Sequence, residues 1–135
     1  MPGIQRWMLV LAGCGLMILL LTAAALPPDP TGYGTHRRLG LPPCTMVALY
    51  GIRCPACGMT TSWSCLMRGE WMRALQANAG GFLMGLLAVA ASPWLLASAA
   101  RGRWWIGCPN EWLILGTGLL LVVVTLGDWV VRIYR

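Results

Sequence analysis

Two cysteines on one short turn form the clearest chemical motif of this chain. Cys54 and Cys57 stand in the run Cys-Pro-Ala-Cys-Gly, which ends at Gly58. Two thiols held this way can bind a metal ion, exchange with a disulfide, or pair with each other. The glycine favours a knuckle, because glycine accepts the positive φ that lets backbone N–H groups face the sulfurs. The motif defines three kinds of chemistry without choosing among them.

The first hypothesis is a zinc site. A structural zinc ion takes four ligands, and the motif supplies only two. The spacing is irregular and no second Cys-x-x-Cys pair exists in the sequence. Single residues upstream in the same segment, Cys44 and the only histidine, could supply the other two ligands. The candidate metal ligands are Cys44, Cys54, Cys57 and His36.

The second hypothesis is a membrane thiol–disulfide oxidoreductase in which Cys54 and Cys57 are the redox pair. A helix that starts just after the motif would lower a thiol pKa through its dipole. Against this, no β-α-β pattern of the thioredoxin kind surrounds the pair. A third hypothesis is a structural disulfide of Cys54 with Cys44 or Cys57 in an oxidising compartment, and a fourth is that the thiols stay reduced and packed. We favour a structural role, by metal or disulfide, over catalysis.

Three apolar runs must position these cysteines. Of the 135 residues, 58% are hydrophobic and only 10% charged, whereas soluble domains carry about a quarter charged residues. The runs at 7–26, 81–100 and 112–131 would each reach about 30 Å as helices, the thickness of the hydrocarbon core. The first is long for the apolar part of a signal peptide, so we expect a retained span. We predict that residues 1–135 form one all-α membrane domain whose spans contact the lipid bilayer.

The segment between the first two spans, residues 27–80, carries the cysteine motif and most of the polar residues. Its first part is rich in proline and glycine, so we expect irregular structure there. Apolar residues then recur at helical spacing, and Gly69 interrupts them. The pattern predicts two short amphipathic helices, 61–68 and 70–78. Neither is long enough to cross a membrane, so they should lie at the interface or pack on the spans.

The spans themselves contain few features beyond hydrophobicity. Gly81 and Gly85 form a Gly-x-x-x-Gly face that can pack within this chain, against a second copy, or against another membrane protein. Pro93 should kink the second span. Asp128 and Arg132 have the i, i+4 spacing of a helical ion pair, which we interpret as a membrane-edge anchor rather than a proton relay.

The charge distribution argues against several functions. The net charge is +6, but the ten basic residues, all arginines, are scattered singly or in pairs, which argues against nucleic-acid binding. The spans lack the paired internal charges of a transport pathway. Arginines at span ends are typical of membrane-edge anchoring. Charges around the first span favour an N-terminus inside and residues 27–80 outside, whereas a count of all arginines favours the reverse.

The region around the cysteine motif resembles a known family. From Gly51 to Thr60 the order is Gly-Ile-x-Cys-Pro-x-Cys-Gly-x-Thr, followed by Arg-Gly, Ala-Leu and an asparagine ahead of an apolar run. This order is similar to that of the bacterial membrane proteins grouped as domain of unknown function 2752, over about residues 44–90. The matching positions are Gly51, Ile52, Cys54, Pro55, Cys57, Gly58, Thr60, Arg68, Gly69, Ala74 and Asn78, with Cys44 ahead of them.

Two positions depart from the family pattern. Thr61 stands where the family usually has arginine, and Ala79 where it usually has proline, so no role that needs that arginine carries over. The resemblance implies a small multi-span protein, which we expect in the bacterial inner membrane. It supplies no function, because the family is uncharacterised. We therefore favour a non-enzymatic scaffold or accessory component, with the thiol oxidoreductase as the alternative.

Overall fold

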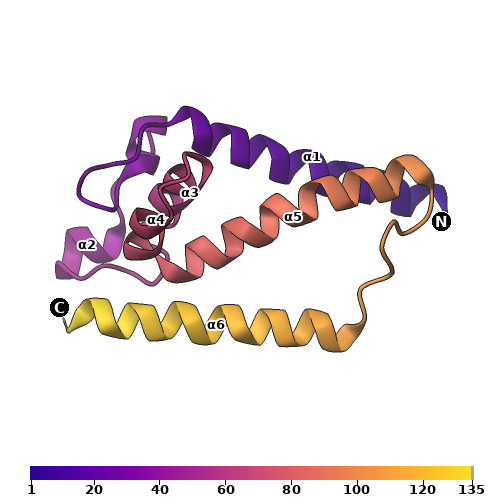
Figure 1. Cartoon of the computed structure of the whole chain (residues 1–135). Coiled ribbons are helices and arrows are strands. Elements are labelled where there is room, and N and C mark those ends of the chain that lie inside the picture. Colours follow the sequence, from indigo (N-terminus) through magenta and orange to yellow (C-terminus); the bar gives the residue numbers. More distant parts are fainter. Residues whose placement is uncertain (135) are drawn as a thin grey trace.

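The structure is a computed structural model that describes residues 1–134. This part of the chain is helical and contains no strand. Three long helices and a group of short ones make up the fold (Figure 1). The long helices are α1 (Gly3–Ala25), α5 (Ala79–Arg101) and α6 (Glu111–Ile133); the short ones are η1 (Thr35–Leu39), α2 (Thr45–Tyr50), α3 (Met59–Met67) and α4 (Trp71–Ala77).

The three long helices confirm the predicted spans. Each has 23 residues and is apolar enough to cross a membrane, and a helix of that length reaches about 35 Å. The helices do not stop where the apolar runs stop. α1 begins four positions before the predicted start, and α5 and α6 extend past their runs at both ends. Polar and amphipathic residues can continue a helix into the headgroup region.

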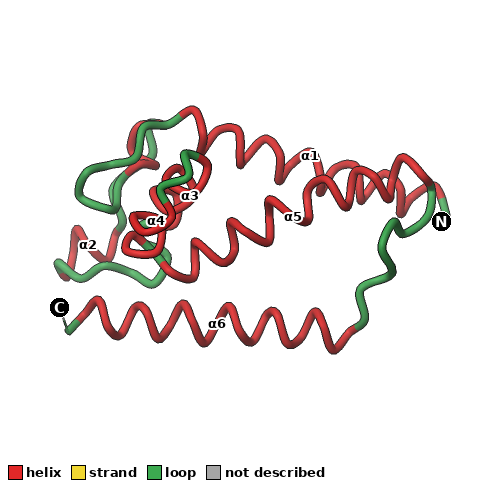
Figure 2. Tube along the Cα trace, viewed as in Figure 1, coloured by secondary structure: helices red, strands yellow, loops and turns green. Residues whose placement is uncertain are grey.

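The long helices alternate in direction. α1 and α5 lie side by side in opposite directions, and residues 102–110 carry the chain from α5 into α6 (Figures 1 and 2). At this end of the bundle, Arg6 Nε donates to the carbonyl of Ala99 at 3.0 Å. The short helices lie at the opposite end, together with the C-terminal end of α6. The cysteine segment and the end of α6 therefore belong on one side of the membrane.

A helical hairpin, α3 and α4, fills the space where α1 and α5 diverge. α3 packs against α1, α4 and α5, and the small buried core contains Cys65 and Leu66 of α3. A Cβ on Gly85 would lie 2.6 Å from Leu66 Cδ2, and one on Gly81 would lie 3.1 Å from the Cα of Met59. In this chain, the Gly-x-x-x-Gly face of α5 receives α3.

Polar side chains also tie the hairpin to its neighbours. Ser62 Oγ donates to the carbonyls of Ala74 at 2.9 Å and Asn78 at 3.1 Å. Arg68 Nη2 donates to the carbonyls of Ala24 and Leu26, each at 3.2 Å. These last-turn carbonyls of α1 have no partner further along their own helix. Arg68 therefore joins the end of the first span to the end of α3.

Two of the four short helices were predicted from the sequence, and these two differ from the prediction in their bounds. The predicted helix 61–68 is α3, which begins at Met59, and 70–78 is α4, which begins at Trp71. Gly69, with φ of +75°, separates them as expected. η1 and α2 were not predicted, because the residues before them are rich in proline and glycine. α5 is one continuous helix through Pro93.

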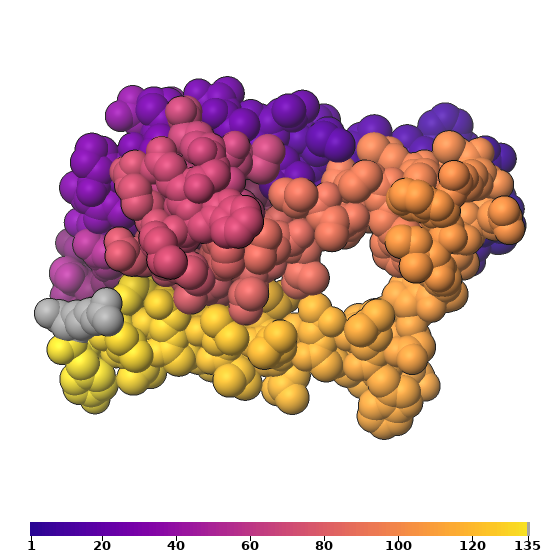
Figure 3. Space-filling view, viewed as in Figure 1, coloured from indigo at the N-terminus to yellow at the C-terminus, as the bar shows by residue number. Residues whose placement is uncertain are grey.

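The third span, α6, has few neighbours. None of its described residues is buried, and α5 is the helix it contacts. A Cβ on Gly80 would lie 2.0 Å from Thr125 Oγ1, so the two helices approach closely there. Toward the start of α6 they separate, and an opening passes between them (Figure 3). The C-terminal half of α6 is the part that packs on the rest of the protein.

Candidate metal centre

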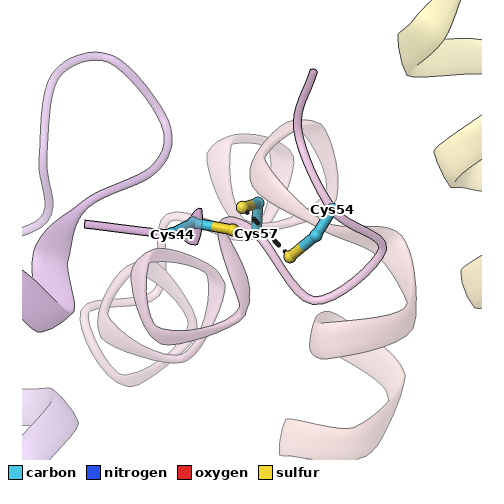
Figure 4. Close-up of side chains that lie close together, drawn as sticks. All are labelled: Cys44, Cys54 and Cys57. Atoms are coloured by element: carbon cyan, nitrogen blue, oxygen red, sulfur yellow. Dashed lines mark hydrogen bonds between the residues drawn. The ribbon is translucent and has the colours of Figure 1, made fainter. Parts of the chain in front are cut away.

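Three cysteines gather their sulfur atoms at the end of the bundle that carries the short helices. The sulfurs of Cys44, Cys54 and Cys57 all lie within 4.8 Å of one another (Figure 4). Cys54 Sγ lies 3.1 Å from Cys57 Sγ, whereas a disulfide has an S–S bond of about 2.05 Å. All three are free thiols. Two thiolates on a tetrahedral zinc ion sit about 3.8 Å apart, so small shifts would let these sulfurs share one ion.

The turn that carries two of these cysteines is held by its own backbone. The N–H of Cys57 donates to the carbonyl of Cys54 at 3.0 Å, and the N–H of Met59 donates to that of Ala56 at 3.1 Å. Cys44 comes from a different place, the residue that precedes α2. The cluster therefore joins two separate pieces of the segment between the spans.

Gly58 makes the turn compatible with its surroundings. Its φ of +89° is a conformation that L side chains rarely adopt. A Cβ at this position would also lie 2.4 Å from the carbonyl oxygen of Ala77 and 2.8 Å from that of Gly32. The positive φ predicted for the glycine of the knuckle is confirmed, and the tertiary packing independently excludes any larger residue.

The side chain of Asn78 forms hydrogen bonds to the backbone of the cysteine turn. This side chain is fully buried. Its Nδ2 donates to the carbonyl of Pro55 at 2.9 Å and to that of Cys57 at 3.2 Å, and its Oδ1 accepts from the N–H of Gly81 at 2.7 Å. One amide group therefore caps α5 and satisfies the carbonyls of the cysteine turn.

The end of α6 supports the same turn. Arg132 Nη1 donates to the carbonyl of Cys57 at 2.8 Å, and Nη2 donates to that of Pro55 at 3.3 Å. The expected ion pair is present, with Arg132 Nε 2.9 Å from Asp128 Oδ2. Trp129 Nε1 donates to the carbonyl of Arg53 at 2.7 Å. The carbonyls of Arg53, Pro55 and Cys57, which alternate along the turn, thus accept hydrogen bonds from side chains of α6.

The thiols differ in acidity. The backbone amide of Val47 at the start of α2, followed by the neighbouring Cys57 thiol, lowers the pKa of Cys44 to about 7. Burial, followed by the adjacent Cys54 thiol, raises the pKa of Cys57 to about 12. Without a metal ion, Cys44 is the first of these two to become a thiolate.

The remaining candidate, His36, lies on η1 and lines the same pocket as the three cysteines, a hollow of about 320 Å³. Its ring nitrogens lie outside the group of sulfurs that approach within 4.8 Å of one another. The structure therefore brings together three of the four suggested ligands and puts the fourth on the pocket wall. Cys14 and Cys108 are exposed and Cys65 lies in the core, so none of these three belongs to the cluster.

Sequence reasoning missed the polar groups that hold the turn. Asn78 is one of the positions that match the family pattern, and this match could have indicated a structural role for its side chain. Trp129 was not among the predicted site residues, and Arg132 was interpreted as a membrane-edge anchor paired with Asp128. Nothing in the local sequence indicates that the end of the third span reaches the turn, because the partners lie more than 70 positions apart.

The comparisons with known proteins agree with the sequence. No curated protein and no solved structure matches the chain. One family does match, over the cysteine cluster, α2, α3, α4 and the first part of α5, leaving α1 and α6 outside. Residues 44–92 match the family described as a protein of unknown function (DUF2752), which confirms the resemblance to that family.

Proposed function

We propose that this protein is a small, non-enzymatic membrane component whose short helices are organised around a zinc ion bound by Cys44, Cys54 and Cys57. The observation that carries the proposal is the approach of three sulfurs from two separate pieces of chain to within 4.8 Å. Thiolates are soft ligands that suit zinc. The resemblance to DUF2752 supports a bacterial inner membrane as its location.

The segment that contains the short helices has only a small apolar core. The described core of buried residues around the hairpin is Cys65, Leu66, Ala74 and Phe82, which is little apolar surface to order about fifty residues. A structural zinc ion contributes about 10–16 kcal/mol of apparent binding free energy, all of it available to folding. A metal ion that joins the start of α2 to the cysteine turn would make this segment rigid.

Three thiolates leave one position of a tetrahedral zinc ion open. His36 lines the same pocket as the three cysteines and is a candidate for the fourth ligand after a movement of η1. Water or an outside ligand is the alternative. Structural zinc sites are closed by four protein ligands, whereas sites with three protein ligands keep a place for exchange.

A second candidate function is thiol–disulfide exchange. The observation in its favour is the 3.1 Å separation between Cys54 Sγ and Cys57 Sγ. A disulfide formed by this pair would take two electrons and two protons from a substrate dithiol, which would become a disulfide. The raised pKa of Cys57 disfavours the thiolate that starts exchange from that sulfur, so we rank this function second.

Metal content and free-thiol count of the detergent-purified protein separate the two. We expect about one zinc ion per chain, lost in Cys44→Ser, Cys54→Ser and Cys57→Ser. Cys14→Ser and Cys108→Ser, which alter exposed cysteines outside the cluster, should retain it. Metal-free protein in which Cys54 and Cys57 cycle between thiol and disulfide would instead establish the redox function.

A further inference from the structure

The pocket beside the cysteine cluster continues into a second hollow. The first, of about 320 Å³, is lined by the three cysteines; the second, of about 250 Å³, lies between α1, η1 and α3. Both are lined by His36, Met59 and Thr60. The second hollow, which we call the α1–α3 groove, is therefore adjacent to the pocket that contains the three cysteines.

The α1–α3 groove is apolar and lies at the end of a membrane span. Thr22 and Ala23 of α1 are part of its wall, close to where α1 ends at Ala25. Its lining includes Leu39 at the end of η1 and Leu41 just after it, both of which are exposed. Its apolar lining residues are Leu19, Leu26, Leu39, Leu41, Met59 and Trp63.

The charges beside the groove favour an acidic head group. Arg37 and Arg38 follow His36 on η1, and both are exposed. The nearby acidic residue is Asp29, whose pKa is lowered first by Thr31 and further by these two arginines. Two guanidinium groups against one carboxylate leave the region around η1 with a net positive charge. A carboxylate is also an ordinary zinc ligand, with an oxygen at about 2.0–2.2 Å.

We propose that the α1–α3 groove binds a long-chain carboxylate, a fatty-acid anion, whose tail lies in the groove and whose head takes the open position on the ion. The inference rests on the proposed metal centre and names its ligand. The tail continues past the groove into the bilayer, beside the end of α1. Thr60 and His36, at the junction of the two hollows, lie beside the head group.

Cobalt-substituted protein in nanodiscs of neutral phospholipid tests this binding. Myristate should change the cobalt ligand-field spectrum in a saturable way. Methyl myristate has the same tail without the charge, and acetate has the same head without the tail, so neither should change it. Leu41→Trp should weaken myristate about tenfold by filling the groove, the equivalent of about two methylene groups. Leu119→Trp, at an exposed position of α6, should not.

Each negative result has a distinct meaning. If the protein binds no cobalt, the proposed metal centre is wrong, and so is the proposed bond between the ion and the carboxylate. Cobalt bound with a spectrum that myristate does not change overturns the fatty-acid proposal alone. Equal responses to the acid and its ester, or equal affinities of the two tryptophan variants, mean that the tail only partitions into the bilayer. Myristate carrying a diazirine should crosslink to the lining residues within 19–26, 39–41 and 59–63, and crosslinks only outside these ranges would contradict the groove.

Discussion

The guanidinium of Arg132 donates a hydrogen bond of 2.8 Å to the backbone carbonyl of Cys57, across 75 positions of sequence. The contact joins the last turns of the third span to the turn that carries two of the three clustered cysteines. α6 has no buried residue of its own, so its attachment at this end depends heavily on polar groups. The sulfur cluster and the third span are therefore mechanically connected.

Arg132→Leu should destabilise the protein. The arginine and Asp128 are 9% and 18% exposed, and leaving one partner of such a partly buried pair without its counterpart costs about 1–3 kcal/mol. The variant also removes donors from two carbonyls of the turn. Unfolding in mixed micelles measures the loss, and Arg103→Leu, at an exposed position at the far end of the bundle, is the control. Equal stability of the two variants would contradict the role of Arg132 in attaching α6 to the cysteine turn.

Gly58→Ala should disrupt the cysteine turn beyond the cost of its backbone conformation. A left-handed conformation costs a non-glycine residue about 1–2 kcal/mol. Gly40→Ala carries that cost alone, because its φ is +78° and a Cβ there would meet no atom within 4 Å. At position 58 the added Cβ also meets the carbonyl of Ala77. We expect cobalt binding to survive in Gly40→Ala and to be lost in Gly58→Ala.

In the metal-free cluster, the thiol of Cys44 should react faster than that of Cys57. Its pKa of about 7 lies below the ordinary thiol value, and the thiolate is the reactive form. The protonated form dominates below that pKa, so the alkylation rate should rise about tenfold between about pH 6 and about pH 8. Iodoacetamide labelling followed by peptide mass spectrometry gives the rate of each cysteine. Faster labelling of Cys57, whose pKa is raised to about 12, would contradict this order.

His36→Ala should retain the metal ion that Cys44→Ser loses. The imidazole lies on the pocket wall outside the sulfur cluster, so its removal leaves the three thiolates in place. We expect unchanged zinc stoichiometry and an affinity within about tenfold of the original. Loss of the zinc in His36→Ala would identify this histidine as the fourth ligand and would close the site.

Cys44 and Cys108 should face opposite sides of the membrane. Cys108 is exposed between α5 and α6, and Cys44 lies at the other end of the bundle, between α1 and α5. In cells, a membrane-impermeant maleimide should label one of two single-cysteine variants, retaining either Cys44 or Cys108, and not the other. Labelling of both from the same side would mean that α5 does not span. The labelled variant also decides between the two orientations that the charges left open.

The sequence by itself determined the fold class and the local geometry. Twenty-residue apolar runs predict spanning helices, because lipid offers the backbone no hydrogen-bond partner outside the helix. The separation of the two short helices at Gly69 and the positive φ of Gly58 could also be predicted. Each depends on the conformational freedom of a single glycine. The sequence suggested Cys44 as a partner of Cys54 and Cys57. It could not predict the distance between the sulfur of Cys44 and the sulfurs of the motif.

Only the tertiary structure decided which groups surround the cysteine turn. Asn78 and Arg132 bond to its carbonyls, α3 occupies the glycine face of α5, and His36 lies outside the cluster. Each of these relationships joins parts of the chain that are far apart in sequence. Hydrophobic periodicity and residue spacing report what lies within a turn or two of a helix. They carry no record of which helix ends meet, and that is decided by how the helices pack against one another.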